Sequence, residues 1–581
     1  MAYSVDFTGD EIYDIYIQDL STGKMVDSLK GVESDGSIEW GDDDNTIYYI
    51  KMDDLHRPYQ VYCHSLNSEE EEEEDELLFE EEDELFWVSL EKSQDSNYLF
   101  IHSSSAETSE VHYVHLKNPE EKLQCVAQRR LKVLYDVEHR NGSWFIVTNV
   151  NQTVNKRFMM CEALPNCQDL WQDVSDEKEI LFNGGEVRAI DTITPFVHHA
   201  VITGREGGLP RVWIVSFDDN DDDNSVKKFV QLTFDEEAHD VDLGPNHLYD
   251  TTTLILSYSS LVTPLSSLLV DMNHPVTTSK EGEGKNKFVM KQKVVPNYNP
   301  DLYTCERTTV QSRDGQTLIP VSLVYKKDII ENNTKHHPTH VTGYGSYGMS
   351  EEASFDYTRL PLLNRGVIYV IAHVRGGGEM GRQWYEEPNG AKYKCKMNTF
   401  NDFVDVARWL ISSRNITTSE LLSCEGRSAG GLLIGASVNQ DPSLWKVAIL
   451  GVPFVDVLCT MVDSTIPLTV GEWEEWGNPN EEYFFEYMKG YSPMNNVRGG
   501  GAYPSMLLTG GLHDPRVQYW EPAKFAAELR HKQDQSTSGP VCLKIDMTAG
   551  HFSASDRYKY LKELAFDYAF LLGQLGVVDS K

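Results

Sequence analysis

The first half of the chain alternates apolar and polar residues in short runs, the pattern of half-buried β-strands. Strand-like runs such as SIEW, TIYYIKM and YQVYCHSL are separated by turn residues. Similar closing strands recur at intervals of 46 to 55 residues and end at Leu20, Leu66, Leu116, Leu164, Phe217 and Met272. A period of roughly 40–50 residues with several strands per unit predicts a β-propeller, here of six blades. Two successive β-sandwiches would explain the strands but not their regular recurrence.

From about residue 300, strand-like runs alternate with amphipathic helical segments instead. The strand-like runs are TLIPVSLVYKK, GVIYVIAHVRG, SMLLTGG and VCLKIDM, and the helical segments include NDFVDVARWLISS and EPAKFAAELRHK. Alternating strands and helices predict a mostly parallel sheet that is covered by helices on both faces. We therefore expect a propeller domain over residues 1–290 and an α/β domain over residues 291–581.

Charge and hydropathy exclude several classes of partner. The formal net charge is −40, which repels nucleic acid and anionic membranes. Part of this charge lies in the run EEEEEEDELLFEEEDE at residues 69–84, which we expect to be a solvated loop insertion. No apolar run approaches the roughly 18 residues of a membrane span, and the N-terminal residues lack the basic and apolar regions of a secretory signal.

The cysteines and glycines point to no cofactor. The nine cysteines are odd in number, scattered and without a C-x-x-C pair, so we expect reduced thiols and a cytoplasmic location. The sequence shows no metal-ligand cluster, and the GGGE stretch lacks the G-x-G-x-x-G spacing of a dinucleotide site. We expect no metal, no cofactor, and a monomer or weak homodimer.

One short motif suggests nucleophilic chemistry. Residues 426–430 spell Gly-Arg-Ser-Ala-Gly, a G-x-S-x-G pattern whose small residues allow a sharp strand-to-helix turn that exposes the serine hydroxyl. Serine is also a common helix N-cap, and an apolar helical run follows Ser428. The motif alone does not separate the two roles.

Two further groups follow Ser428 in the order that such a nucleophile requires. The strand-like run LLTGG leads to Asp514, and KIDMTAG leads to His551. Each residue by itself has an ordinary explanation, a turn before Pro515 for Asp514 and a surface loop for His551. Three groups in the order Ser, Asp, His, each after its own strand, favour a catalytic triad.

The pKa values of these groups assign their roles. A serine hydroxyl does not ionise alone, so His551 must accept its proton, while Asp514 orients the imidazole and stabilises the imidazolium. The tetrahedral oxyanion needs preorganised donors. We predict one donor at the backbone N–H of Ala429, and a second at the phenol of Tyr344, which follows the strand-like run THVTG.

Longer stretches over nearly all of residues 300–570 resemble the prolyl oligopeptidase family of serine peptidases. They are GYGSYG, HVRGGGEMGRQWYEE, NTFNDF, GRSAGGLLIG, GVPFVDV, IPLTVGEWEEWGNP, YSPMNNV, LHDPRVQYWEPAK and AGHFSASDRYK. The resemblance implies an α/β-hydrolase domain capped by a propeller. It also implies that the triad is Ser428, Asp514 and His551, that Tyr344 is the oxyanion tyrosine, and that Arg516 grips the substrate backbone.

The same resemblance implies what is cleaved. In the branch of the family that cuts after basic residues, the specificity pocket for Arg or Lys is formed by glutamates that match Glu472 and Glu474. Carboxylates beside Trp473 and Trp476 would bind a guanidinium or ammonium strongly. Acidic residues that favour a second basic residue map to Glu352 and to position 354. The latter is a serine here, which weakens the expected preference for paired basic sites.

The resemblance also implies how the two domains divide the work. The propeller admits short peptides and excludes folded proteins, so short basic peptides are the expected substrates. Family members begin with a leading segment and have seven blades, so we expect about one blade and that segment to be absent here. The alternatives are an esterase or thioesterase like the prolyl endopeptidase-like branch, and a catalytically impaired, truncated scaffold.

Overall fold

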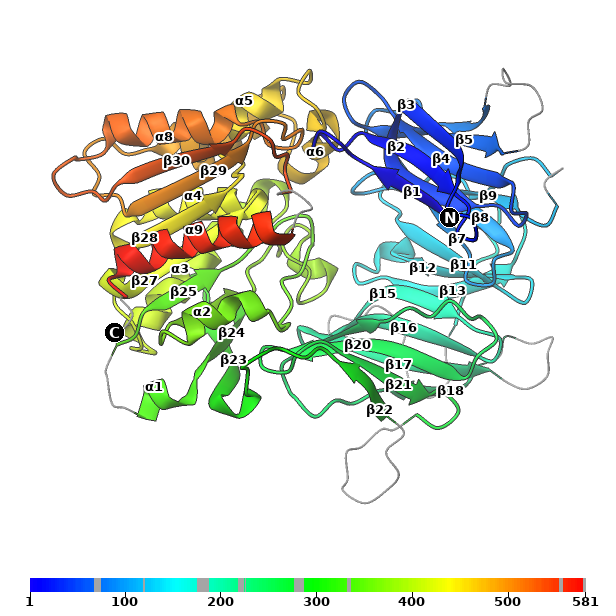
Figure 1. The fold of residues 1–581 in the computed structure, drawn as a ribbon, viewed down its shortest axis with the longest axis horizontal. Helices are drawn as coiled ribbons and strands as arrows, with labels where there is room; N and C mark the ends of the chain where they lie inside the picture. The colour runs from blue at the N-terminus through cyan, green and yellow to red at the C-terminus, as the bar shows by residue number, and fades with distance from the viewer. Residues whose placement is uncertain are drawn as a thin grey trace.

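The computed structural model describes residues 1–66, 75–118, 121–174, 188–217, 224, 226–275, 287–331, 336–552 and 557–577. Two domains lie side by side (Figure 1), a β-rich domain that carries the N-terminus and an α/β domain that follows it. The last strand of the first domain ends at Gln292, and the first strand of the second domain begins at Tyr303. The connection between the domains is therefore the short segment 293–302.

The β-rich domain consists of five antiparallel sheets within the described residues. The first sheet has six strands: β1 (Ala2–Val5), β2 (Tyr13–Gln18), β3 (Met25–Trp40), β4 (Thr46–Met52), β5 (Pro58–Ser65) and β6 (Glu76–Glu80). The second has β7 (Trp87–Lys92), β8 (Tyr98–Ser104), β9 (Ser109–His115) and β10 (Gln124–Ala127). The third has β11 (Tyr135–Arg140), β12 (Ser143–Thr148), β13 (Arg157–Glu162) and β14 (Gln172–Asp173).

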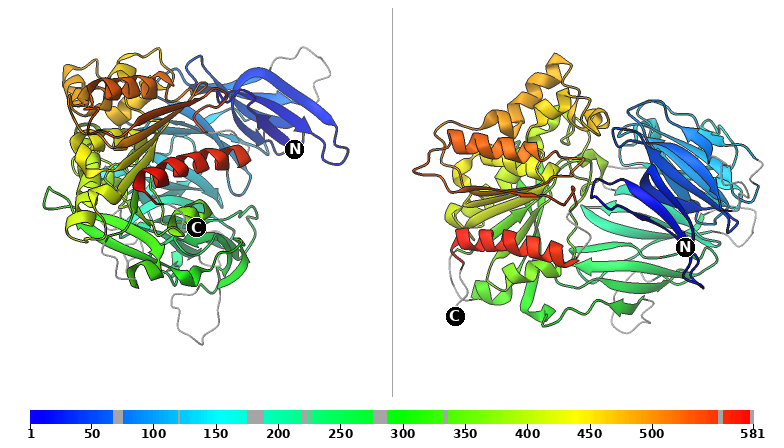
Figure 2. Two further views of the ribbon diagram at one scale, coloured as in Figure 1. Left: turned by 60° about the vertical axis from the view of Figure 1, so that its left-hand side comes forward. Right: turned by 45° about the horizontal axis from the view of Figure 1, so that its top comes forward.

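The remaining two sheets have four strands each. They are β15 (Arg188–Pro195), β16 (His199–Glu206), β17 (Leu209–Phe217) and β18 (Val226–Gln231), then β19 (His239–Leu243), β20 (Thr253–Ser260), β21 (Ser266–Asp271) and β22 (Lys287–Gln292). Four strands per sheet and successive sheets side by side (Figure 2) are the architecture of a propeller. The predicted β-propeller is confirmed as an architecture, although not in its number of blades.

The predicted number of blades is wrong, because the structure has five sheets rather than six or seven. The first two sequence repeats merge into the six-stranded sheet. Strand β3 is 16 residues long and pairs with β2 through its first half and with β4 through its second half, with a register shift between Ser34 and Ile38. Since β3 continues through this irregularity, no break separates the first repeat from the second.

The acidic run is also only partly a loop. Residues 69–74 lie outside the described residues, but Glu76–Glu80 forms β6, which pairs with β5. The segment ELLFE, which interrupts the acidic run with apolar residues, forms the strand, and Phe79 lies opposite Val61. The sequence prediction counted charges and overlooked this short apolar segment.

The α/β domain is built on one eight-stranded sheet with the order β23-β24-β26-β25-β27-β28-β29-β30. The strands are β23 (Tyr303–Gln311), β24 (Leu318–Lys326), β25 (Thr339–Thr342), β26 (Ile368–Ala372), β27 (Leu422–Arg427), β28 (Val447–Gly451), β29 (Ser505–Gly511) and β30 (Val541–Asp546). From β26 to β30 every neighbouring pair is parallel. This is the mostly parallel sheet that the sequence pattern predicted.

Helices cover both faces of this sheet. They are α1 (Lys327–Glu331), α2 (Leu360–Leu363), α3 (Met397–Ser412), α4 (Ala429–Gln440), α5 (Val457–Val462), α6 (Thr469–Trp476), α7 (Glu482–Tyr491), α8 (Trp520–Lys532) and α9 (Arg557–Leu575). Alternate residues of β28 belong to different cores, since Ala448 packs with α3, α4 and α8 while Ile449 packs with α9. Successive side chains of a strand point to opposite faces, so α9 lies across the sheet from α4.

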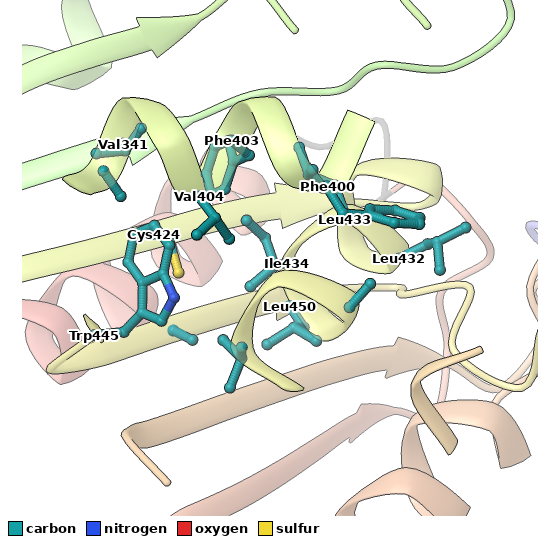
Figure 3. Packing of buried hydrophobic residues seen from close by; sticks show 14 of the residues in the cluster. Val341, Phe400, Phe403, Val404, Cys424, Leu432, Leu433, Ile434, Trp445 and Leu450 are labelled. Carbon is teal, nitrogen blue, oxygen red and sulfur yellow. The ribbon is translucent and has the colours of Figure 1, made fainter. Parts of the chain in front are cut away.

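The main core lies between the sheet and helices α3 and α4. Figure 3 shows Leu432, Leu433 and Ile434 of α4 beside aromatic and aliphatic residues of α3 and of the central strands. All three leucine and isoleucine side chains are fully buried. The helix that begins directly after the candidate nucleophile is therefore held in place by the largest apolar cluster of the domain.

Candidate active site

The predicted triad and oxyanion residues follow four parallel strands. Tyr344 lies just beyond β25, Ser428 beyond β27, Asp514 beyond β29 and His551 beyond β30. The carboxyl ends of parallel strands meet at one edge of the sheet, which is where α/β proteins place their chemistry. The fold thus brings together four residues that are spread over the segment from Tyr344 to His551.

Ser428 occupies a strained backbone conformation between β27 and α4. Its φ is 57° and its ψ is −123°, in a region that L-residues rarely adopt. The turn is possible because Gly426 has no side chain, since a Cβ there would lie 2.2 Å from the carbonyl oxygen of Gly430. Ser428 occupies the N-cap position of α4, but its side chain makes no capping hydrogen bond. The interpretation that the hydroxyl caps the helix is therefore wrong.

Asp514 and His551 form a buried pair. The Nδ1 of His551 lies 2.8 Å from the Oδ2 of Asp514, and the side chains are 7% and 0% exposed. The second carboxylate oxygen, Oδ1, accepts hydrogen bonds from the backbone N–H groups of Arg516 and Val517, each at 2.9 Å. These bonds fix the carboxylate, and a carboxylate fixed in this way favours the tautomer in which Nδ1 carries the proton and Nε2 is free to accept one.

Tyr344 is suited to donate a hydrogen bond. Burial, together with the carboxylates of Glu472 and Glu475, raises the pKa of Tyr344 to about 12, while a hydrogen bond with Ser428 opposes this shift. The phenol therefore keeps its proton at neutral pH. Ala429, which directly follows Ser428, is buried at the first position of α4, where backbone N–H groups have no partner within the helix.

Two members of the predicted triad, Ser428 and His551, line a cavity between the two domains with a volume of about 820 Å³. Its wall includes Ser428, His551 and Tyr344 from the α/β domain and Trp87 from β7 of the propeller. The predicted recognition residues Glu352, Glu472 and Arg516 also line it. The nucleophile and most of the predicted substrate contacts therefore share one chamber.

Glu472 is a half-buried carboxylate in this chamber. It accepts hydrogen bonds from the phenol of Tyr347 at 2.8 Å and from the indole Nε1 of Trp476 at 2.7 Å. Burial is the main reason that the pKa of Glu472 is raised to about 7, and the nearby carboxylate of Glu475 adds to the shift. A carboxylate held this way against aromatic walls is a strong acceptor for a cationic group.

Glu474 does not line this cavity. Its Oε2 accepts a hydrogen bond from the backbone N–H of Glu107 in the propeller at 3.1 Å. The separation follows from secondary structure, because residues 469–476 form helix α6, in which positions two apart point to different sides. The residue that shares a side with Glu472 is Glu475, three positions on, and the alternating pattern assumed from the sequence did not identify it.

The other two recognition residues are also engaged by the propeller. The guanidinium of Arg205 in β16 forms a short ion pair with Glu352. Arg516 forms a two-pronged pair with Glu11, with the Nε of Arg516 2.9 and 3.0 Å from the two carboxylate oxygens and its Nη2 2.6 Å from one of them. Glu11 lies in the loop between β1 and β2.

Sequence reasoning missed several residues of this region. Tyr347 and Glu475 lie beside Glu472, and Lys396 lies next to Glu475 at the start of α3. Trp476, which the sequence placed beside the carboxylates, does contact Glu472. The signal for Glu475 was present in the spacing of VGEWEEWG, since positions three and four apart share a helix face. Nothing in the sequence alone pointed to Lys396 or Glu11.

Among the described residues, one group has the composition of a metal site, contrary to the sequence prediction. Glu110, His112 and Cys125 place one ligand atom each within 4.8 Å of one another on the paired strands β9 and β10. Arg129 binds the same carboxylate, since its backbone N–H donates to Glu110 at 2.7 Å and its guanidinium lies 3.8 Å away. This positive charge opposes a bound cation.

No helix in the described part of the chain is long and apolar enough to cross a bilayer. The profile of the prolyl oligopeptidase family matches residues 353–578, and that of the prolyl oligopeptidase N-terminal β-propeller domain matches residues 1–280.

Individual relatives match over almost the whole chain. Protease 2 of Moraxella lacunata is 38% identical over 99% of this chain and 78% of its own length. Dipeptidyl aminopeptidase BI of Pseudoxanthomonas mexicana is 35% identical over 100% of this chain and 75% of its own.

Solved structures of related proteins also match over almost the whole chain. Oligopeptidase B from Trypanosoma brucei, in a closed form with covalently bound antipain, is 42% identical with a TM-score of 0.89, over 100% of this chain and 77% of its own. Oligopeptidase B from Leishmania major is 38% identical with the same TM-score, over 99% and 77%. A serine-type peptidase fold, a triad-like cluster at the sheet edge and these matches together show that the chain belongs to the prolyl oligopeptidase family.

Proposed function

We propose that this protein is a serine endopeptidase that cleaves short peptides on the carboxyl side of Arg or Lys. The observation that carries the proposal is the half-buried, hydrogen-bonded carboxylate of Glu472 in the same cavity as Ser428 and His551. The similarity to oligopeptidase B structures supports it. The alternatives, an esterase and a scaffold, have no comparable observation in their favour.

The chemistry begins with the attack of Ser428 Oγ on the carbonyl carbon of the scissile bond. The Nε2 of His551 accepts the hydroxyl proton, and the ion pair with Asp514 stabilises the imidazolium. The C–N bond then breaks, and the imidazolium gives its proton to the leaving amine. An acyl-enzyme ester remains on Ser428, and a water molecule activated by His551 hydrolyses it by the same steps in reverse.

The oxyanion that forms in each half of the reaction needs donors that are already in place. We assign these donors to the phenol of Tyr344 and the backbone N–H of Ala429. The raised pKa of Tyr344 ensures that the phenol is protonated when charge develops on the substrate oxygen. Neither donor has to reorganise, because β25 and α4 are both fixed in the main core.

Glu472 would take the guanidinium or ammonium of the residue before the scissile bond. Its two hydrogen bonds orient the carboxylate, and a substrate cation would lower its pKa from about 7 by favouring the ionised form. Arg516 would hold the peptide backbone, and Glu352 a neighbouring part of the peptide. Glu474 would act indirectly, by holding the propeller segment at Glu107 against α6.

The propeller would restrict the size of the substrate. It contributes Trp87 to the wall of the catalytic cavity, and it contacts Arg516, Glu352 and Glu474. A cavity of about 820 Å³ would hold a few residues of an extended peptide but not a folded domain. Short, unfolded peptides are therefore the proposed substrates.

The test is the hydrolysis of fluorogenic peptides that end in Arg, Lys, Pro or Phe, with Ser428→Ala as the blank. We expect rapid, Ser428-dependent cleavage after Arg and Lys only, and loss of that preference in Glu472→Gln. Cleavage after Pro or Phe at equal rates would contradict the assignment of Glu472. Turnover of acyl esters without cleavage of any peptide would favour the esterase, and inactivity on both would favour the scaffold.

A further inference from the structure

We propose that Lys396 is a positioning residue that couples the oxyanion loop to the specificity helix and sets the charge of the specificity pocket. The oxyanion loop is the segment 343–347, which carries Tyr344, and the specificity helix is α6, which carries Glu472. The coupling of Lys396 to α6 rests on the function proposed above, whereas its contact with the oxyanion loop does not.

The contacts of Lys396 join these two elements directly. Its Nζ donates to the carbonyl oxygen of Gly345 and to the Oγ of Ser346, both at 2.7 Å. The same ammonium lies 3.5 Å from the Oε1 of Glu475 and 4.7 Å from the centre of the Trp476 ring. One side chain therefore holds two residues that adjoin Tyr344 and two residues of the helix that carries Glu472.

The loop that Lys396 holds has little freedom of its own. Gly345 has a φ of +74°, and a Cβ at this position would lie 2.5 Å from the Cγ2 of Thr399 in α3. The Oγ1 of Thr399 also donates to the same Gly345 carbonyl at 3.3 Å. The oxyanion loop is thus pressed against the start of α3, and the ammonium of Lys396 supplies the strongest bonds of that contact because it is charged.

The specificity side of the contact is a network of buried groups. Glu475 accepts a hydrogen bond from the backbone N–H of Tyr347 at 3.2 Å and a short one from the phenol of Tyr385. Tyr347 in turn donates its phenol to Glu472 at 2.8 Å. The chain of contacts runs from Lys396 through Glu475 and Tyr347 to the carboxylate that faces the substrate.

The charges in this network leave one place for a cation. Glu472 and Glu475 are two carboxylates, Lys396 is one ammonium, and Tyr344 and Tyr347 keep their phenol protons because their pKa values are raised. Arg516 also lies near Glu472, but Glu11 neutralises it. When Glu472, Glu475 and Lys396 are all ionised, their net charge of −1 matches a single guanidinium or ammonium of a substrate.

An uncharged residue at position 396 would disturb both sides of the contact. The side chain of Lys396 is only 1% exposed, so its charge is desolvated and acts strongly on its neighbours. Burial lowers the pKa of Lys396 to about 8, and the carboxylates of Glu475 and Glu472 oppose that shift. Without the ammonium, the uncompensated Glu475 carboxylate would raise the pKa of Glu472 further.

The experiment compares Lys396→Met, which removes the charge but keeps the length, with Lys392→Met. Lys392 is a matched control because it is also fully buried but forms its ion pair with Glu107 of the propeller at 2.9 Å. Two substrates are used, p-nitrophenyl acetate, which needs the oxyanion donors but no cation site, and a fluorogenic peptide that ends in Arg. The ratio of the two kcat/KM values is followed against pH, because a pH effect on the catalytic step that both substrates share cancels in that ratio.

For Lys396→Met we expect kcat on the ester to fall about 100-fold, since displacement of a catalytic group by about 1 Å can have an effect of this size. We also expect the midpoint of the peptide-to-ester ratio to move to higher pH. Lys396→Arg, which keeps the charge, should restore that midpoint. Lys392→Met should leave kcat on the ester as in the parent protein, because the ion pair of Lys392 is with Glu107 and not with the oxyanion loop.

A folded Lys396→Met variant with the parent kcat on the ester and an unchanged midpoint would overturn the proposal. If this variant does not fold, the double variant Lys396→Met/Glu475→Gln removes the ion pair as a unit, and Ser346→Ala removes one loop contact without a buried charge. Parental kcat on the ester in both would overturn it equally. If the parent protein cleaves the ester but no Arg or Lys peptide, the proposed specificity fails, while the ester result still decides the positioning role.

Discussion

The reacting groups and the recognition groups of this site are supported in different ways. Ser428, Asp514 and His551 come from three strand ends of one sheet, and the pair between Asp514 and His551 lies entirely within the α/β domain. In contrast, Arg516 is bound by Glu11 and Glu352 by Arg205, and both partners belong to the propeller.

This difference suggests a division of labour between the domains. The predicted reacting groups all belong to one domain, although the propeller backbone at Gly9 lies against Gly550, next to His551. The predicted recognition groups have side-chain partners in both domains, so a change at the propeller alters the partners of Arg516 and Glu352. Four substitutions test this division, in order of decreasing expected effect.

Ser428→Ala should produce the largest loss, about a millionfold in kcat, because the nucleophile and its base act as a unit. We expect the double variant Ser428→Ala/His551→Ala to be no worse than the single one. The measurement is single-turnover hydrolysis of the peptide that the parent protein cleaves best. Strictly additive losses would show that the two residues do not act as one catalytic unit.

Tyr344→Phe should lower kcat by about 100- to 1000-fold, the usual effect of removing one oxyanion donor. KM should change little, because the hydroxyl contacts the oxyanion rather than the ground-state carbonyl. Tyr347→Phe is the matched control, since it removes a phenol of the same loop that donates to Glu472. A fall in kcat of equal size in both variants would argue against a specific role for Tyr344.

Glu472→Gln should reduce kcat/KM for Arg and Lys peptides by roughly 10- to 100-fold, because a neutral amide loses a charge-assisted contact. In the parent protein, the pKa of about 7 means that the carboxylate fraction grows as the pH rises through neutrality. The peptide-to-ester ratio of kcat/KM should therefore increase with pH around 7 in the parent protein and be flat in the variant. An unchanged pH dependence in Glu472→Gln would show that another group titrates.

Glu11→Gln should have the smallest effect, a few-fold increase in KM, because a partly exposed ion pair contributes about 0–1 kcal/mol. Arg516 loses the partner that orients it towards the cavity, while kcat on p-nitrophenyl acetate should stay constant. Glu33→Gln removes an exposed charge from the same propeller sheet and serves as the control. A large fall in ester kcat in Glu11→Gln would break the division of labour between the domains.

The catalytic cluster was predictable because it depends on local patterns. Ser428, Asp514 and His551 each follow an apolar run, and parallel strands bring their carboxyl ends to one edge whatever the rest of the chain does. The alternation of strands and helices predicted the sheet for the same reason. The assignment of these residues to catalysis stays a prediction until the substitutions are made.

The number of blades and the directions in which the side chains of α6 point were harder to predict from the sequence. A repeat in sequence marks where strands recur, but the pairing of β3 with both β2 and β4 decides that two repeats share one sheet. In the same way, Glu472 and Glu474 look equivalent as alternating residues, and only the helical period separates them. A local sequence pattern indicates where strands and helices form. The hydrogen-bond pairing of the strands and the helical period then decide which side chains point to the same side.

The sequence by itself therefore determined the two-domain plan, the order of the triad and the position of its members at strand ends. Only the tertiary structure decided that Lys396 pairs with Glu475, that Glu11 binds Arg516 and that Arg205 binds Glu352. These partners are between 79 and 505 positions apart in the chain. Periodicity reports only on neighbours within an element, while the pairing of distant charges depends on how whole elements and domains pack together.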